Sequence, residues 1–310
     1  MLSTFRQFWT NQELRIQEPW TGSIAIARGF LALAAGLTYL LTPASVLFSP
    51  VPGALASRCG ASAGWMAWPC WIPDSAVGGA QLAAGALCLV VASGWFPAAT
   101  AIPLALLLIA LPLASAAPDG GDQLAGILGL LLVPVSLSDW RLHSWRAPHP
   151  GRLWRTRTFV AAWMLTLAKA QIAVVYLVAC LGKLGSAEWA DGTSLFYWVR
   201  NSVFGAPAIL RPLAEWVTVQ PPLLAALTWG TLVLEFTLAI CVFLPTAFRL
   251  RALLPLALLF HLGIWLVLGV SSFAFVMAAA LFILVVPLGW VAMRKQQPLI
   301  DEPHEQETPA

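Results

Sequence analysis

Eight apolar runs divide this chain, and most of them are long enough to cross a lipid bilayer. They fall at residues 24–42, 76–96, 99–117, 123–137, 159–182, 223–245, 253–269 and 273–293. A helical span needs about 20 apolar residues, because each residue rises 1.5 Å through about 30 Å of hydrocarbon. Lipid cannot hydrogen-bond to the backbone, so each run must satisfy its own N–H and C=O groups as a helix. The runs therefore predict an all-α polytopic membrane protein with about eight transmembrane helices.

Composition supports this class. Hydrophobic residues make up 59% of the 310 residues and charged residues only 10%, which excludes an ordinary soluble domain of this length. The sequence also lacks the HExxH, GxSxG, P-loop and CxxC patterns of soluble catalytic and redox sites.

The distribution of Lys and Arg predicts the orientation, because these residues are retained on the cytoplasmic side. With eight spans, the side that holds the N-terminus carries Arg6, Arg15, Arg141, Arg146, Arg152, Arg155, Arg157, Arg249, Arg251, Arg294 and Lys295, whereas the other carries Arg58, Arg200 and Arg211. Both termini are therefore expected in the cytoplasm. The Arg-rich loop at 139–158 is interpreted as a topological anchor, since no nucleic-acid motif accompanies it.

Segments outside the predicted spans differ in character. Residues 1–22 mix aromatic and polar side chains and are expected to lie at the membrane interface. Residues 294–310 are polar and are expected to form a disordered cytoplasmic tail. A loop at 186–222 joins the fifth and sixth spans and is rich in aromatic side chains, namely Trp189, Phe196, Tyr197, Trp198 and Trp216. We expect this loop to form a lid on the external membrane surface.

Two of the five cysteines, Cys59 and Cys70, share the first external loop. External placement implies an oxidising compartment, so these two residues are expected to form a disulfide. Metal binding and free thiols are the alternatives, and the lack of nearby histidines gives metal binding little support. No metal site is predicted.

Several ionisable residues fall inside predicted spans, where a charge is costly unless it is paired or functional. Lys169, Tyr176 and Lys183 follow one stripe of the fifth span. Lys169, Glu235 and His261 are expected near the bilayer midplane, either as a Lys169–Glu235 ion pair that fixes helix packing or as a proton relay. Arg28 and Lys183 are placed near span ends, where each side chain can snorkel to water. Lys183 alternatively serves as a base.

A polar turn, APDGGDQ, joins the third and fourth spans on the external side. Pro-Asp-Gly-Gly is typical of a tight turn, and Asp122 is expected to cap the following helix. Alternatively, Asp119 and Asp122 form a polar site, or a weak cation site, together with Lys183, Glu188 and Asp191.

Motifs along most of the membrane region carry a family resemblance. ARGFLALAAGLTYL at 27–40, the Cys59 and Cys70 loop, PDGGDQLAGILGLLLVPVSLSDWR at 118–141 and QIAVVYLVACLGKLGSAEWADGTSLFYWV at 171–199 resemble the SdpB-type family of the sporulation-delaying toxin system. That family is similar to the HTTM group, which shares its helical domain with the vitamin K-dependent gamma-carboxylase. Residues 176–184 with Trp189 and Gly192, and LFHLGIWLVLGVSSFAFVM at 259–277, carry this wider similarity. The resemblance implies an HTTM-like transmembrane domain over residues 23–293.

The resemblance also implies a function, namely maturation of an exported antimicrobial peptide toxin at the external face. The implied partners are the toxin precursor, a small SdpA-like protein and membrane lipid. The alternatives are a quinone-dependent carboxylase-like enzyme and a non-enzymatic peptide-binding scaffold or immunity protein. A quinone-like or lipid molecule is the ligand class considered.

Roles follow for individual residues. Lys183 matches the lysine regarded as the base in the carboxylase, and His261 matches the histidine of its Phe-His-Leu motif. The expected catalytic residues are Lys183, Asp119, Asp122, His261 and Glu235, the last two as a relay. The expected substrate-binding residues are Trp189, Tyr176, Gln123, Glu188 and Asp191.

Overall fold

The computed structural model describes residues 19–49, 51–61, 63–148, 152–202 and 204–287. Within these ranges the chain forms helices and loops, and the one β-type pairing is an isolated bridge between Trp95 and His143. The all-α prediction is confirmed. The expected tail at 294–310, and all but the last four residues of the expected interfacial segment at 1–22, lie outside the described residues.

Six helices in the described part of the chain are long and apolar enough to cross a bilayer. They are α2 (Gly22–Leu41), α5 (Asp74–Ala92), α7 (Gly120–Leu137), α8 (Trp154–Leu184), α12 (Pro221–Ala239) and the continuous stretch Thr246–Leu268. That stretch comprises α13 (Thr246–Phe248), the π-helical η4 (Arg249–Leu253) and α14 (Leu254–Leu268). Two apolar helices are shorter, α6 (Ala101–Ala114) and α15 (Ser271–Val285). Each of the eight predicted runs overlaps one of these helices.

Short helices connect the long ones. The connection between α2 and α5 contains four of them, α3 (Ala44–Leu47), α4 (Ala54–Cys59), η1 (Gly64–Met66) and η2 (Trp68–Trp71). The loop after α8 contains α9 (Ala187–Ala190), α10 (Ser194–Val199) and α11 (Arg211–Thr218), and η3 (Cys241–Phe243) follows α12. The predicted lid loop therefore contains three short helices.

The seventh predicted run begins too late, because its helix starts at Thr246 rather than at residue 253. Pro255 explains the irregular turn inside this helix. A proline has no backbone N–H to donate, and in a regular α-helix its ring would collide with the backbone carbonyl one turn earlier. The wider π-helical turn of η4 directly precedes α14 and accommodates that ring.

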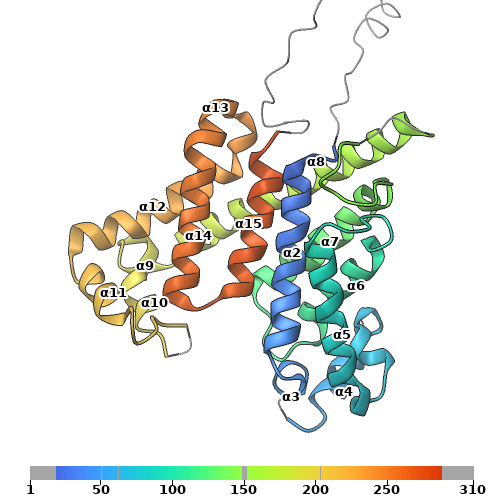
Figure 1. Ribbon diagram of the computed structural model, residues 1–310. Helices are drawn as coiled ribbons and strands as arrows, with labels where there is room; N and C mark the ends of the chain where they lie inside the picture. The colour runs from blue at the N-terminus through green and yellow to red at the C-terminus, as the bar shows by residue number, and fades with distance from the viewer. Residues whose placement is uncertain (1–18, 50, 62, 149–151, 203, 288–310) are drawn as a thin grey trace, which may run out of the picture.

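The helices form two neighbouring groups around α15 (Figure 1). In one group α2 packs against α5 and α15, and α6 packs against α7; in the other α8 packs against α12, and α14 against α15. The start of α2 and α13 lie at the upper end of Figure 1, whereas α3 and α4 lie at the lower end. The Arg-rich segments around α13 and the start of α8 are thus on the opposite end from α4.

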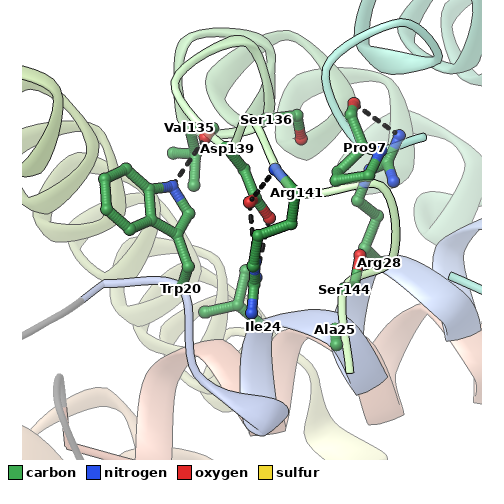
Figure 2. Close-up of a pocket in the computed structure, with 10 residues that line it drawn as sticks. All are labelled: Trp20, Ile24, Ala25, Arg28, Pro97, Val135, Ser136, Asp139, Arg141 and Ser144. Atoms are coloured by element: carbon green, nitrogen blue, oxygen red, sulfur yellow. Dashed lines mark hydrogen bonds and ion pairs between the residues drawn. The ribbon is translucent and has the colours of Figure 1, made fainter. Parts of the chain in front are cut away.

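The prediction that Arg28 snorkels to water is wrong, because Arg28 is buried at the upper end of α2. Its side chain is 5% exposed. Its Nη2 atom donates to Thr100 Oγ1 (2.6 Å) and to the carbonyl oxygen of Pro97 (3.3 Å), both in the loop between α5 and α6. Figure 2 shows the contact with Pro97. A buried guanidinium is costly unless hydrogen-bonded, and these acceptors come from a helix pair that sequence alone could not identify.

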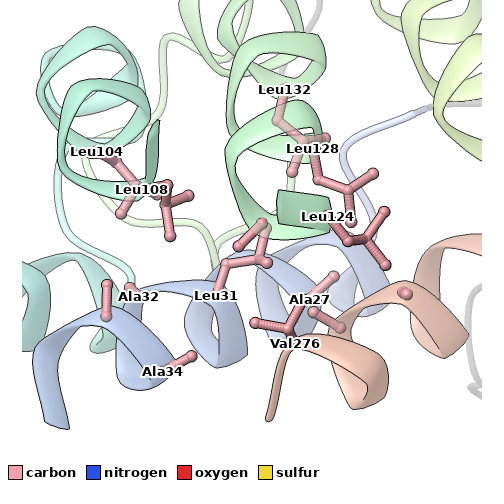
Figure 3. Close-up of a cluster of buried hydrophobic side chains, with 14 of the residues drawn as sticks. Ala27, Leu31, Ala32, Ala34, Leu104, Leu108, Leu124, Leu128, Leu132 and Val276 are labelled. Carbon is pink, nitrogen blue, oxygen red and sulfur yellow. The ribbon is translucent and has the colours of Figure 1, made fainter. Parts of the chain in front are cut away.

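The hydrophobic core lies where α2, α6, α7 and α15 meet. Each of these helices contributes an almost completely buried side chain, in order Leu31, Leu108, Leu128 and Val276 (Figure 3). Small residues allow the close approach: a Cβ added to Gly36 of α2 would lie 3.0 Å from the Cβ atom of Cys88 on α5. Membrane helices associate largely through such close packing, because lipid is as apolar as the core.

The predicted disulfide between Cys59 and Cys70 is present, with 5.5 Å between the Cα atoms. It closes the segment that contains η1 and η2, and this segment covers the lower end of α2. Trp68 packs edge-on against Phe48 and Tyr39, and its indole N–H donates to the hydroxyl of Tyr39 (3.2 Å). That hydroxyl in turn donates to the carbonyl oxygen of Leu107 on α6 (2.6 Å). The bridge therefore holds a loop that ties α2 to α6.

Candidate functional site

An ion pair joins the last turn of α8 to α12. Lys183 Nζ donates to both carboxylate oxygens of Glu235, at 2.7 and 2.9 Å, and lies 3.4 Å from the carbonyl oxygen of Ala179. The Glu235 side chain is 8% exposed and that of Lys183 is 26% exposed. Lys183 is therefore not a snorkelling anchor, because a buried carboxylate from another helix holds its ammonium. Charge-assisted contacts of this kind are stronger than neutral hydrogen bonds.

Trp189 lies over the ion pair. The Lys183 Nζ atom is 5.4 Å from the centre of the Trp189 ring, a distance at which an ammonium is attracted to the face of an indole. Trp189 belongs to α9, which begins three residues after α8 ends. The short loop between the two helices therefore brings the ring back over the lysine.

The Trp-x-x-Gly turn is fixed by Gly192. This residue has a φ of +83°, and a Cβ on it would come within 3.2 Å of Ala225 and of the Trp229 ring on α12. The indole N–H of Trp229 donates to the carbonyl oxygen of Ala190 (3.3 Å). Only glycine meets both requirements without strain, so the turn docks α9 on the helix that carries Glu235.

A second polar contact lies between α8 and α14. The hydroxyl of Tyr176 and the Nε2 atom of His261 are 3.0 Å apart, and both side chains are at most 3% exposed. The other imidazole nitrogen, Nδ1, is buried without a partner among the described residues. Phe273 of α15 packs edge-on against the imidazole, with 5.8 Å between ring centres.

Tyr176→Phe is expected to lower the free energy of unfolding by about 1–3 kcal/mol, because the buried imidazole then loses the contact at Nε2. The measurement is thermal unfolding in detergent micelles. Tyr197→Phe is the matched control, since Tyr197 is 59% exposed. Equal unfolding temperatures for the two variants would contradict a stabilising role for the Tyr176 hydroxyl.

Tyr176 and Lys183 share one face of α8, because residues i and i+7 are two turns apart. Cys180 lies between them on the same face and contacts the carbonyl oxygen of Leu232 on α12 at 3.5 Å. Sequence analysis did not assign a role to Cys180. The spacing of four from Tyr176 and three from Lys183 was the available indication. The two polar contacts thus line one seam between α8, α12 and α14.

Lys169 lies in a different part of the fold, and the predicted Lys169–Glu235 pair is wrong. Its Nζ atom donates to the carbonyl oxygens of Leu284 (3.3 Å) and Val286 (2.6 Å). These carbonyls end α15, where the partial negative charge of a helix terminus favours a cation. Lys169 is about 21 Å along α8 from Lys183, so it takes no part in the seam.

The two carboxylates of the polar turn cap α7. Asp119 Oδ1 accepts from the backbone N–H of Asp122 (2.8 Å), and Asp122 Oδ2 accepts from the backbone N–H of Asp119 (3.2 Å). This capping box makes Asp119 the N-cap, so the prediction that Asp122 occupies that position is wrong. Ser272 Oγ donates to Asp119 Oδ2 at 3.4 Å, which links the turn to the start of α15. Neither carboxylate is bonded to Lys183.

Gly121 sets the distance between this turn and α15. A Cβ on Gly121 would lie 2.9 Å from the Cα atom of Phe273, whereas one on Gly120 would meet nothing within 4 Å. We expect Gly121→Ala to lower the free energy of unfolding by about 1–3 kcal/mol, because the backbone of α15 must shift. Gly120→Ala is the control and is expected to be neutral or slightly stabilising. Similar unfolding temperatures in detergent for both alanine variants would refute this account of the contact.

The other expected substrate-binding residues are solvent-exposed. Asp191 Oδ1 accepts from the backbone N–H and the hydroxyl of Thr193, at 3.1 and 2.6 Å. Gln123 and Glu188 are exposed and make no side-chain hydrogen bond within the described residues. No group of three or more His, Cys, Asp or Glu side chains within metal-binding reach occurs in the same residues. Gln123, Glu188 and Asp191 are therefore not part of the seam.

Comparisons with known proteins show a family and two relatives. Residues 123–290, more than half of the chain, match the model of the HTTM domain, and this range contains Tyr176, Lys183, Glu235 and His261. The chain is 27% identical over 305 residues to the uncharacterized protein YitO of Bacillus subtilis (strain 168), covering 93% of this chain and 92% of YitO. It is 29% identical over 203 residues to the sporulation-delaying protein SdpB of the same organism, covering 64% of this chain and 61% of SdpB. No solved structure matches.

Proposed function

We propose that this chain, which belongs to the HTTM domain family, is a membrane-embedded factor for maturation of an exported antimicrobial peptide toxin. The observation that carries the proposal is the buried Lys183–Glu235 pair under Trp189. Such a pair is expensive to bury, and replacing it with apolar side chains often stabilises a protein. A membrane protein that keeps it next to a second polar contact, Tyr176 with His261, has a use for it.

The proposed site opens to the external face. Lys183 ends α8, and the Arg-rich loop precedes the start of the same helix at the other end of the molecule. The positive-inside rule then places the Arg-rich end in the cytoplasm and Lys183 at the external end. An exported precursor meets the protein on that side.

The segment α9–α11 is the proposed docking surface for the precursor. Its helices α10 and α11 pack against α12, the helix that carries Glu235. The segment exposes large apolar side chains, namely Tyr197, Trp198, Ile209, Leu213 and Trp216. Exposed aromatic and aliphatic side chains at a membrane surface bind apolar peptide segments and lipid. The similarity to SdpB supports a toxin precursor as the partner, and the family resemblance implies a small SdpA-like protein beside it.

The chemistry proposed for the pair is proton transfer. Glu235 holds the Lys183 ammonium through two contacts, so Lys183 accepts a proton from a substrate only after its own proton has moved to Glu235. His261 and Tyr176, which lies two turns along α8 from Lys183, are the proposed relay. Carboxylase-like chemistry would need a neutral amine that faces a quinone, and the ion-paired Lys183 fits that requirement poorly. The proposal therefore uses no quinone.

The test compares secreted peptide from cells that have and lack this protein. Mass spectrometry of the culture medium is expected to detect the mature toxin only when the protein is present. Processing to the same mature mass in its absence would refute the proposed function. Expression with and without a small SdpA-like protein then shows whether the two act together.

A non-enzymatic scaffold is the second candidate, and one observation favours it. The Lys183 ammonium donates three hydrogen bonds within the described structure, two to the Glu235 carboxylate and one to the carbonyl oxygen of Ala179. A pair satisfied in this way can serve packing alone. A scaffold tolerates changes that preserve the pair but loses function when the exposed face of α10 and α11 is altered.

A further inference from the structure

A second polar site lies at the opposite end of the molecule from Lys183, around Arg28. Its lining comes from the start of α2, the loop before α6 and the end of α7, with the loop that follows α7 (Figure 2). Arg28 is 95% buried, and its Nη1 atom has no hydrogen-bond partner among the described residues, although Nη2 has two. An unpaired charged donor in a membrane protein is costly. The described part of the fold therefore supplies no acceptor for Nη1.

The one carboxylate in the lining does not supply it. Asp139 Oδ1 and Oδ2 each accept from Arg141, through Nε and Nη2, at 2.7 Å. Arg141 Nη1 is also used, by the carbonyl oxygen of Arg146. This pair is neutral overall, so the lining keeps one formal positive charge, that of Arg28. Asp139 opposes an incoming anion, but two contacts to Arg141 neutralise it.

Two further donors face the same pocket. Ser136 and Ser144 line it, each is 5% exposed, and neither hydroxyl makes a hydrogen bond within the described residues. Arg157 adds positive charge beside the lining, with its guanidinium carbon 5.2 Å from the centre of the Trp20 ring. The two free hydroxyls suit an anionic oxygen because each can donate to it, and the positive charge of the buried Arg28 beside them attracts it.

We propose that this pocket binds an anionic phosphate oxygen through the hydroxyls of Ser136 and Ser144, with the positive charge of Arg28 beside them. The space within the pocket is about 10 Å³, enough for one oxygen atom, so the rest of the phosphate stays at the mouth. Trp140 and Trp145, which are 55% and 53% exposed, lie in the loop that forms one wall. Tryptophan gathers at the level of lipid headgroups. The phosphate thus belongs either to an anionic phospholipid or to free phosphate.

The experiment uses the full chain in detergent and measures the shift in its thermal unfolding temperature. The three probes are phosphatidylglycerol, inorganic phosphate and a diacylglycerol without phosphate. We expect phosphatidylglycerol to raise the unfolding temperature and the diacylglycerol not to. Ser136→Ala/Ser144→Ala is expected to weaken the apparent affinity about a hundredfold, since two hydrogen bonds to a charged group are lost. Arg28→Met removes the positive charge beside the hydroxyls and is also expected to weaken the apparent affinity.

Ser93→Ala is the matched control, because Ser93 lies at the same end but donates to the carbonyl oxygen of Val90 and does not line the pocket. If inorganic phosphate acts as strongly as the lipid, the anion site stands and its source is free phosphate. If the diacylglycerol acts equally, or if the double serine variant responds like the Ser93 control, the proposal is overturned. No shift with any probe means a pocket that holds only water, and this result also overturns it.

Discussion

Lys183→Met is expected to lower the free energy of unfolding by about 3 kcal/mol, because it leaves the Glu235 carboxylate buried without its cation. Glu235→Gln is expected to be milder, since the amide still accepts from Lys183, whose side chain is 26% exposed. The double variant Lys183→Met/Glu235→Leu removes both charges and is expected to recover most of the stability. Thermal unfolding in detergent and the amount of protein in the membrane report these changes.

The double variant separates stability from function. If the pair only packs α8 against α12, a stable double variant should also restore toxin maturation. If the pair transfers protons, the double variant should accumulate normally and mature no toxin. A double variant less stable than Lys183→Met would show that the charges are not the main contribution at this site. Lys169→Met is a useful comparison, because Lys169 donates only to backbone carbonyls at the end of α15.

Loss of the Cys59–Cys70 disulfide is expected to destabilise the protein by about 3 kcal/mol. The bridge joins residues 11 apart in sequence, and closing a loop of this size restricts the unfolded chain by about that amount. Cys59→Ser/Cys70→Ser should therefore unfold at a lower temperature than the wild type. The lowered stability also reflects looser packing of Trp68 on Tyr39 and Phe48.

Reduction provides an independent control for this prediction. The wild type treated with a thiol reductant is expected to match the double serine variant, while the variant itself does not respond. Cys88, Cys180 and Cys241 are buried free thiols, so replacing them with alanine should leave the response to reductant intact. An unfolding temperature that is the same with and without the bridge would contradict a stabilising role.

The helices were predictable because lipid leaves the backbone few alternatives. Every apolar run overlaps a helix, and polar turns such as the one at Asp119 and Asp122 occur where turn chemistry indicated them. The ends of the helices were less predictable. The helix that contains His261 begins at Thr246, because η4 continues through two arginines that resemble a loop in sequence.

Partners across helices could not be predicted, since sequence does not fix the relative height or rotation of the spans. Glu235 was expected to meet Lys169, yet Lys169 lies at the level of the end of α15 and Glu235 meets Lys183. The contacts of Lys183 with Trp189 and of Tyr176 with His261 depend on the turn at Gly192 and on the packing of α14. The residues of the site were thus recognisable as unusual, but their pairing required the structure.

The most direct test of the proposed reactive pair is the charge exchange Lys183→Glu/Glu235→Lys, assayed by the mass of the secreted toxin. The exchange preserves an ion pair between α8 and α12 but moves the amine to α12 and away from Trp189. At membrane levels matched to the wild type, we expect the exchanged protein to leave the precursor unprocessed. Release of mature toxin at the wild-type rate would show that the pair serves only to hold the helices together.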